Sequence, residues 1–263
     1  MVSKLTDRHE LKRFDCIWTG FNIRTRKCYD DVVMEDRFAM ATDAGGKGTE
    51  AGYDCWAATY DDGDPSTWLD EPFLLDQLKP FPGCRILDLG CGTGRYLRRL
   101  ASGLYRITAV DLSRGMLCRA RRDIERREEI SWVQTSVTCL PFQSRLFDRV
   151  MSGLVLDHIE RPEHLFGQIA AVLKQKGRAV VTAVHPDMQR LTGADIELAS
   201  LNGSVRISGH LHEVRSLIVA AQDATLMVEC IEEPVVTEAM VSRRSDWRHK
   251  LGCPALLLLA LSK

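Results

Sequence analysis

The sequence predicts an α/β protein with a doubly wound, mostly parallel sheet that helices cover on both faces. Two observations predict this class. Short runs rich in apolar and β-branched residues alternate with segments of helical periodicity, as expected for consecutive βαβ units. In addition, the apolar run at residues 86–89 leads through a glycine-rich turn into a helical segment, which is typical of the first βα unit in such sheets.

The elements follow one another in a regular order. Asp64 and Pro65 have the residue types of an N-cap and a first helical position, so they predict a helix that carries Trp68, Leu69, Phe73, Leu74 and Leu78. Strands are predicted at Arg85–Leu89, Arg106–Val110, Ile130–Gln134, Asp148–Leu154 and Arg178–Ala183, and helices at Arg95–Ser102, Gly115–Arg127 and Pro162–Lys174. The last part is predicted to contain a helix at His212–Asp223, a strand at Thr225–Ile231, a helix at Pro234–Trp247 and a strand at Ala255–Leu261.

The chain divides into two parts of unequal length. Residues 1–50 show no clear period, and the stretch Ala41–Gly52 consists of small and polar residues that indicate a linker. We therefore expect an N-terminal extension with its linker at residues 1–50 and one folded domain at residues 51–263. The GGKGT run in the linker is not a phosphate loop, because the required glycine spacing is absent.

Composition argues against several classes of partner. Lys and Arg number 35 and Asp and Glu number 36, which gives a formal net charge of −1 and no strong field for nucleic acid or anionic lipid. The longest apolar stretch, Ala255–Leu261, is much shorter than the ~20 residues of a membrane-spanning helix. The nine cysteines are scattered, which is typical of a reducing compartment. We expect a cytoplasmic protein without nucleic-acid or membrane partners.

The sharpest motif is the glycine-rich turn Asp88-Leu-Gly-Cys-Gly-Thr-Gly94. Glycines allow the backbone to approach a ligand closely, and the following helix offers free N–H groups at its start. A dinucleotide fingerprint requires G-x-G-x-x-G, whereas Arg95 stands here in place of the third glycine. A nicotinamide-dependent oxidoreductase is therefore an alternative that the glycine spacing disfavours.

The same residues resemble motif I of the class I S-adenosylmethionine (SAM) dependent methyltransferases. Ala109–Leu117, with Asp111 at the end of a predicted strand, resembles the second motif, and Leu140–Phe142 resembles the motif ahead of the fourth strand. Together with Tyr53–Asp61, these motifs are most similar to the ubiquinone-biosynthesis-like small-molecule methyltransferases. The resemblance covers residues 53–263. It implies a Rossmann-like methyltransferase fold, with a seven-stranded sheet and an antiparallel terminal strand, and SAM as cofactor.

The resemblance also implies a cofactor site. It assigns Asp88 and the turn Gly90–Gly94 to the methionine portion of SAM and Asp111 to the ribose hydroxyls. Ser136 and Val137 are assigned to the adenine, with a serine where the family usually has an aspartate. The predicted cofactor-binding residues are Tyr53, Trp56, Tyr60, Asp88, Gly90, Cys91, Gly92, Gly94, Asp111, Leu112, Met116, Ser136, Val137 and Leu154.

Three aromatic residues near the start of the domain recur at helical spacing: Tyr53, Trp56 and Tyr60. They fit a helix that packs its aromatic face on the core. They also fit a lid over the methionine end of the cofactor, because aromatic faces attract a sulfonium cation. The family resemblance favours the lid.

Candidate catalytic residues follow the predicted strands at their carboxyl ends, where ligands bind in open α/β sheets: Asp157, His158 and His185. His158 is the best candidate for a general base, since the unperturbed pKa of histidine, ~6.5, suits neutral conditions. The alternative is that His158 only bonds a neighbouring loop or shapes the pocket.

A long insertion around residues 185–212 is expected to cover the substrate, which makes His185, Asp187, His210 and His212 candidates for substrate contact. The two histidines of the H-x-H pattern would share one face of an extended chain and could hold a metal with Asp187. No third ligand is fixed by local spacing, so no metal site is predicted.

The leading hypothesis is a SAM-dependent methyltransferase that transfers a methyl group to O, N or activated C of a small-molecule acceptor. A nicotinamide-dependent oxidoreductase and a catalytically silent SAM-binding partner protein are the alternatives.

Overall fold

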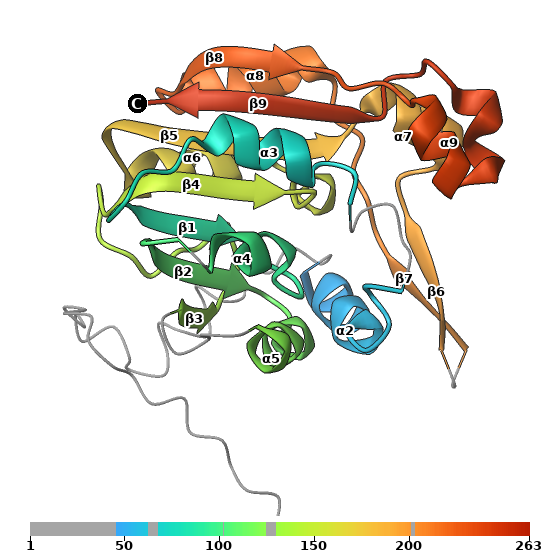
Figure 1. Cartoon of the computed structure of the whole chain (residues 1–263), viewed down its shortest axis with the longest axis horizontal. Helices are drawn as coiled ribbons and strands as arrows, with labels where there is room; N and C mark the ends of the chain where they lie inside the picture. The colour runs from blue at the N-terminus through green and yellow to red at the C-terminus, as the bar shows by residue number, and fades with distance from the viewer. Residues whose placement is uncertain (1–45, 63–67, 102, 125–129, 201–202) are drawn as a thin grey trace, which may run out of the picture.

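The computed structural model describes residues 46–62, 68–101, 103–124, 130–200 and 203–263 (Figure 1). Its main sheet has seven strands in the order β3-β2-β1-β4-β5-β9-β8. Strands β1 to β5 run parallel, whereas β9 runs antiparallel between β5 and β8. The strands are β1 Arg85–Leu89, β2 Arg106–Asp111, β3 Ile130–Gln134, β4 Phe147–Gly153, β5 Leu173–Val184, β8 Met227–Glu232 and β9 Leu256–Ser262. The predicted fold class is confirmed.

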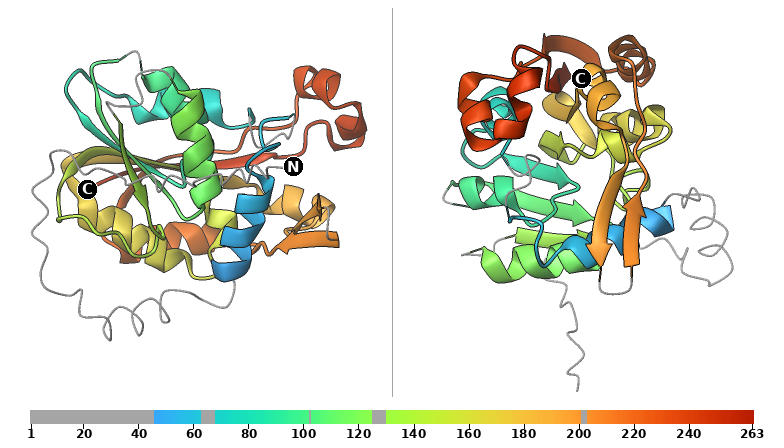
Figure 2. Two further views of the ribbon diagram at one scale, coloured as in Figure 1. Left: turned by 90° about the horizontal axis from the view of Figure 1, so that it is seen from below. Right: turned by 90° about the vertical axis from the view of Figure 1, so that its right-hand side faces the viewer.

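Helices cover both faces of this sheet, with α3, α4 and α5 on one side and α6 and α8 on the other (Figure 2). The alternation of side chains along β1 explains the two layers, since Ile86 packs with one helix layer and Leu87 and Leu89 pack with the other. The helices are α2 Gly46–Trp56, α3 Glu71–Leu78, α4 Arg95–Leu100, α5 Arg114–Asp123, α6 Pro162–Val172, α7 Pro186–Thr192, α8 Val214–Asp223 and α9 Glu238–Arg243, with 3₁₀ turns η3 Leu156–His158 and η4 Ser245–Lys250.

Helix α3 begins later than the sequence predicted. Asp64 and Pro65 lie outside the described residues, while Trp68 and Leu69 precede the helix, which starts at Glu71. Asp70 at the N-cap position is fully buried, and its carboxylate accepts hydrogen bonds from Arg95, Tyr96 and Thr182. Long-range bonds therefore fix the start of α3, and local propensity could not reveal them.

Smaller boundary errors have local causes. Ile124 is extended and ends α5 at Asp123, and residues 125–129 of the predicted helix lie outside the described part. Leu173 and Lys174 belong to β5, so α6 ends at Val172. The helix predicted at Pro234–Trp247 is replaced by α9 and the 3₁₀ turn η4.

The linker predicted at Ala41–Gly52 is wrong from residue 46, because Gly46–Trp56 forms helix α2. Glycine disfavours an isolated helix. Gly52 nevertheless suits this one, since a Cβ there would lie 2.4 Å from Cγ1 of Ile207. Tertiary packing thus overrides local propensity, and the division placed at residue 50 falls inside a helix.

The insertion around residues 185–212 contains α7 and a hairpin of β6 Ile196–Ser200 and β7 Gly203–Ile207, which the sequence did not predict. This hairpin stands outside the main sheet and packs beside α2 (Figures 1 and 2). The insertion therefore contacts the helix at the start of the described residues.

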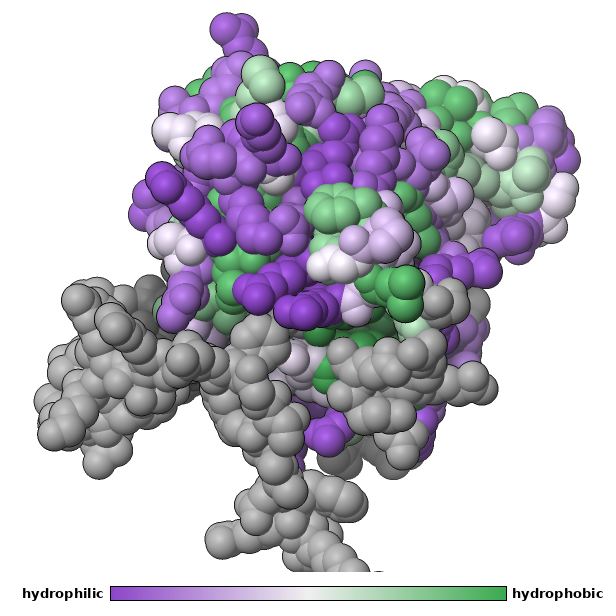
Figure 3. Space-filling model, turned by 60° about the vertical axis from the view of Figure 1, so that its left-hand side comes forward, coloured by the Kyte–Doolittle hydropathy of each residue, from purple (hydrophilic) through white to green (hydrophobic). Residues whose placement is uncertain are grey.

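The face shown in Figure 3 is largely hydrophilic, and its hydrophobic residues lie between polar ones in small groups. Across the described ranges, no helix combines the length and apolar character that a membrane span requires.

Candidate active site

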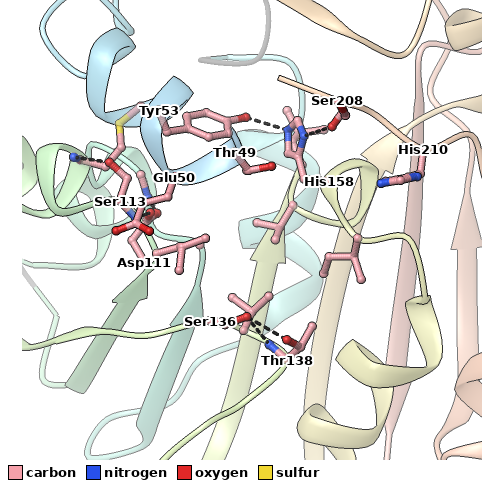
Figure 4. Close-up of a pocket in the computed structure, with 18 of the residues that line it drawn as sticks. Thr49, Glu50, Tyr53, Asp111, Ser113, Ser136, Thr138, His158, Ser208 and His210 are labelled. Carbon is pink, nitrogen blue, oxygen red and sulfur yellow. Dashed lines mark hydrogen bonds between the residues drawn. The ribbon is translucent and has the colours of Figure 1, made fainter. Parts of the chain in front are cut away.

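A cavity of about 750 Å³ lies at the carboxyl ends of β1, β2 and β4, next to α2 (Figure 4). Its volume falls within the range of small-molecule sites, ~300–1,000 Å³. Twelve of the residues predicted for the site line this cavity: Tyr53, Tyr60, Gly90, Gly92, Asp111, Leu112, Met116, Ser136, Val137, Leu154, His158 and His210.

The glycine turn after β1 forms the part of the cavity nearest Asp111. Gly92 has a φ of 54°, and a Cβ at this position would meet no atom within 4 Å, so the backbone faces open space. The amide of Gly92 donates to Oδ2 of Asp111 at 2.8 Å, and the amide of Ser113 donates to Oδ1 at 2.8 Å. Desolvation raises the pKa of Asp111 to about 6, against the lowering effect of these bonds.

Asp88 does not line the cavity. Its side chain is fully buried in β1, and neither carboxylate oxygen has a hydrogen-bond partner among the described residues. Burial raises the pKa of Asp88 well above its usual range, although the nearby Arg95 cation opposes the shift. An unpartnered buried carboxyl is costly, and such groups gather at binding sites.

Cys91 and Gly94 also lie outside the main cavity. Cys91 lines a small adjoining hollow together with Tyr60 and Arg95. Gly94 begins α4 with a φ of 82°, and a Cβ there would lie 2.4 Å from Cδ1 of Ile124. Gly94 therefore allows close packing of α4 on α5.

The segment after β3 forms another end of the cavity. The Ser136 hydroxyl bonds the Thr138 hydroxyl at 2.8 Å and accepts from the Thr138 amide at 3.2 Å (Figure 4). Val137 is buried beside them. A hydroxyl pair of this kind can donate or accept hydrogen bonds toward a ligand.

Helix α2 and the turn that follows it bring two of the three predicted aromatic residues to the cavity. Tyr53 and Tyr60 line it, whereas Trp56 stacks behind Tyr53 with ring centroids 5.9 Å apart. Trp56 also meets Tyr60 edge-on at 4.8 Å. Tyr53 and Tyr60 thus face the cavity, as the lid hypothesis requires, and Trp56 packs against both of them.

His158 lies opposite the Asp111 side of the cavity and is held between two elements (Figure 4). The Tyr53 hydroxyl lies 2.7 Å from Nε2, and the carbonyl oxygen of Ser208 lies 3.4 Å from Nδ1. The carbonyl can only accept, so Nδ1 carries the proton and Nε2 accepts from Tyr53. Desolvation lowers the pKa of His158 to about 4, and the ring is neutral at pH 7.

Leu154 connects β4 to the loop that carries His158. It has a φ of 57°, a left-handed conformation that is uncommon for a residue with a Cβ, and it lines the cavity. The backbone carbonyl and hydroxyl of Thr182 accept from its amide at 3.0 and 3.2 Å. Strain of about 1–3 kcal/mol is thus held by bonds from β5.

Asp157 and His185 were predicted as catalytic, but neither lines the cavity. The carboxylate of Asp157 accepts from the Val184 amide at 3.0 Å and from the Gln189 side chain at 2.9 Å. Burial raises the pKa of Asp157 to about 7. Nδ1 of His185 accepts from the Asp187 amide at 3.1 Å and caps α7. Asp157 thus joins β5 to α7, whereas the His185 ring bonds α7 and Glu233, and neither position supports a catalytic role.

The remaining candidates for substrate contact lie in different places, and one of the three lines the cavity. His210 lines the cavity, whereas the His212 ring bonds the backbone carbonyl of Ile159 at 2.8 Å. Asp187 is 54% exposed and pairs with Arg190. In the described part of the chain, no group of three or more His, Cys, Asp or Glu residues could hold a metal ion.

The sequence did not reveal half of the cavity lining: Thr49, Glu50, Ser113, Thr138, Cys139, Gly153, Val155, Ile159, Glu160, Arg161, His164 and Ser208. Ser113 was detectable, because a serine ahead of a helical segment is a typical N-cap. Ser208 was not, because it contacts His158 through a backbone carbonyl that every residue has.

Comparisons with known proteins agree with this fold. Residues 87–181 match the family of methyltransferase domains. The chain is 30% identical over 151 residues to the biotin biosynthesis bifunctional protein BioHC of Saccharophagus degradans, covering 55% of this chain and 27% of that protein. It is 35% identical to the demethylmenaquinone methyltransferase of Clavibacter sepedonicus, covering 39% of this chain and 42% of the relative. It thus spans less than half the length of these curated relatives.

Among solved structures, a SAM-dependent methyltransferase from Mesorhizobium loti superposes with a TM-score of 0.61 at 24% identity, covering 77% of this chain and 99% of that one. Residues 87–181 therefore belong to a methyltransferase domain, and the fold is that of a solved SAM-dependent methyltransferase. The resemblance inferred from the glycine turn and Asp111 is confirmed at this level.

Proposed function

We propose that this protein transfers a methyl group from SAM to a small-molecule acceptor and that the cavity at the carboxyl edge of the sheet holds both. One observation carries the proposal. The Gly92 amide bonds Asp111 in one wall of the cavity, and the opposite wall contains His158. A carboxylate beside a glycine turn suits the nucleoside part of the cofactor.

The residues present fit SAM on the cofactor side. Asp111 retains free lone pairs for the ribose hydroxyls, and the open space at Gly92 admits a ligand close to the backbone. The carboxyl of Asp88, two residues before Gly90 and without a hydrogen-bond partner among the described residues, would supply negative charge toward the ammonium group of SAM. SAM, when bound, supplies an electrophilic methyl group. Tyr53 and Tyr60 would face its positive charge.

The residues on the acceptor side fit a proton-bearing acceptor. In neutral His158, Nε2 has a free electron pair that can act as a base, and in this structure the Tyr53 hydroxyl is hydrogen-bonded to it. An acceptor O–H or N–H could bond Tyr53 or replace its hydroxyl at Nε2, so that the proton ends on His158. This arrangement favours acceptors that lose a proton, such as hydroxyl or acidic carbon groups, and we place His158 and Tyr53 in this role.

The acceptor is proposed to be a small molecule. A cavity of about 750 Å³ has room for a cofactor and a compact second molecule. The relatives named for biotin biosynthesis and for demethylmenaquinone methylation support the same class.

S-adenosylhomocysteine binding is the first test. At 100 times its dissociation constant it should add ~2.7 kcal/mol of apparent stability, which raises the melting temperature by several degrees. NADH serves as the matched control and should leave the melting temperature unchanged. No shift with millimolar S-adenosylhomocysteine would refute the cofactor assignment.

Turnover requires a second experiment, in which methyl-labelled SAM is incubated with the protein and cell extract and products are identified by mass spectrometry. A labelled small molecule supports the proposal. Binding without any labelled product would favour the alternative of a catalytically silent SAM-binding protein.

A further inference from the structure

Helix α2 is attached to α5 by one carboxylate. Oδ1 of Asp54 accepts from the Ser113 hydroxyl at 2.5 Å and from the Gly115 amide at 2.7 Å. Gly115 makes the close approach possible, since a Cβ there would lie 3.1 Å from Cα of Asp54 and 3.2 Å from Cβ of Ala57. Asp54 thus caps the start of α5 from a different helix.

Ser113 links this contact to the cofactor side of the cavity. Its hydroxyl accepts from the Met116 amide at 3.1 Å while donating to Asp54, and its own amide donates to Asp111 at 2.8 Å. Because Ser113 is almost fully buried, its orientation is fixed by these bonds. The position of Asp54 is therefore coupled to that of Asp111.

The residue before Asp54 reaches the other side of the cavity. Tyr53 directs its hydroxyl to His158, as Figure 4 shows, at a distance of 2.7 Å from Nε2. Tyr53 and Asp54 thus attach a single turn of α2 to two separate walls. On its other flank, α2 contacts β7 through Gly52.

We propose that Asp54 is a positioning residue that holds α2 on α5 and so assembles the Asp111 and His158 sides of the cavity at the same time. The proposal rests on the proposed function for the identity of the ligands. Binding of the nucleoside part at Asp111 would favour the bonded form of Ser113, and this form places Tyr53 at His158 before the acceptor reacts. Asp54 itself does not line the cavity.

The test combines three variants with two measurements. Asp54→Ala removes the acceptor of both bonds, Asp54→Asn retains a carbonyl oxygen in the same place, and Asp62→Ala removes an exposed carboxylate from the turn after α2. Calorimetric titration gives the affinity for S-adenosylhomocysteine. Hydrogen exchange of peptides covering residues 46–56 gives the opening of α2 without any ligand.

We expect Asp54→Ala to raise the dissociation constant about tenfold and to speed exchange in α2 by a similar factor, as for loss of a helix cap. Asp54→Asn should remain within about threefold of the wild type in both measurements, since one oxygen accepts both bonds. Asp62→Ala should match the wild type. Exchange in β1 and β4 should stay slow in every variant, which excludes global unfolding.

Gly115→Ala gives an independent perturbation, because the added methyl group separates α2 from α5 while the carboxylate remains; exchange in α2 should rise. The proposal would be overturned if α2 exchanged equally fast in Asp54→Ala and Asp62→Ala. It would also be overturned if α2 exchanged as fast in Asp54→Asn as in Asp54→Ala. A wild-type protein that does not bind S-adenosylhomocysteine would refute the proposed function instead, and the exchange of the unliganded variants would still decide the role of Asp54.

Discussion

The two sides of the cavity are built in different ways. The Asp111 side consists of short segments at or just after the ends of strands: Gly90 and Gly92 after β1, residues 111–113 at the end of β2 and residues 136–139 after β3. The His158 side combines parts that are distant in sequence. Tyr53 and His158 are 105 residues apart, and Ser208 is a further 50 residues along the chain.

This difference shows why one side is readable from the sequence and the other is not. In the first, a glycine turn and a carboxylate at a strand end suffice, because parallel strands bring these ends together. In the second, the bond between Tyr53 and His158 depends on how α2 packs against α5 and β7. Variants on the Asp111 side should therefore change mainly the affinity for the cofactor, and variants on the His158 side should change mainly the turnover number.

The largest expected effect separates chemistry from cofactor binding. His158→Ala should lower the turnover number about a hundredfold or more, the usual contribution of a general base. The dissociation constant of S-adenosylhomocysteine should change less than about threefold, because the ring lies across the cavity from Asp111. Steady-state kinetics with the identified acceptor and calorimetry measure the two quantities. Equal losses of turnover and of affinity would show that the two sides are not separable.

The next effect concerns the cofactor side. Asp111→Ala should raise the dissociation constant of S-adenosylhomocysteine roughly ten- to hundredfold, through loss of charge-assisted hydrogen bonds. Asp157→Ala is the matched control: it also removes a buried carboxylate at a strand end, but one that bonds Val184 and Gln189 outside the cavity. Its melting temperature should fall while its affinity persists. Similar dissociation constants for Asp111→Ala and Asp157→Ala would contradict the conclusion that only Asp111 belongs to the cofactor site.

A smaller effect appears in the pH dependence of stability. The pKa of His158 is about 4 in the folded protein, below the ordinary value of 6.5. The unfolded chain therefore binds a proton that the folded chain does not, and this residue costs stability as the pH falls from 6.5 toward 4. His158→Gln removes this contribution, so its melting temperature relative to the wild type should improve between pH 7.5 and pH 4.5.

Asp111 and Asp157 contribute in the opposite sense. Their pKa values are raised, to about 6 and about 7, so their stabilising contribution is present at low pH and is lost as the pH rises through these values. Both carboxyls remain in His158→Gln, and subtraction of the two melting curves isolates the histidine. A constant difference across pH would mean that His158 is not desolvated.

The smallest expected effect lies at the segment after β3. Ser136→Ala removes one hydroxyl that bonds Thr138, and a neutral hydrogen bond contributes ~0.5–1.5 kcal/mol net. The dissociation constant of S-adenosylhomocysteine should rise about two- to tenfold. Adenosine titrated alone should show the same ratio, whereas an unchanged adenosine affinity would place the adenine elsewhere.

The sequence by itself determined the sheet and the Asp111 side of the cavity. Strands β1 and β3 begin and end where the sequence predicted, because apolar runs bounded by turns suit buried parallel strands. Gly92, Asp111 and Ser136 were found for a related reason, since a turn directly after a strand contains its own chemical signal. The start of α3 and the hairpin β6–β7 lacked such a signal.

Only the tertiary structure decided which histidine faces the cavity. His158 and His185 both follow strands, yet His158 bonds Tyr53 while His185 caps α7. It also decided that residues 46–52 form part of a helix that covers the site rather than a linker. The physical reason is the same in each case: contacts between segments far apart in the chain, such as Gly52 with Ile207 and Asp54 with Ser113, outweigh local propensity, and the linear order of residues does not contain them.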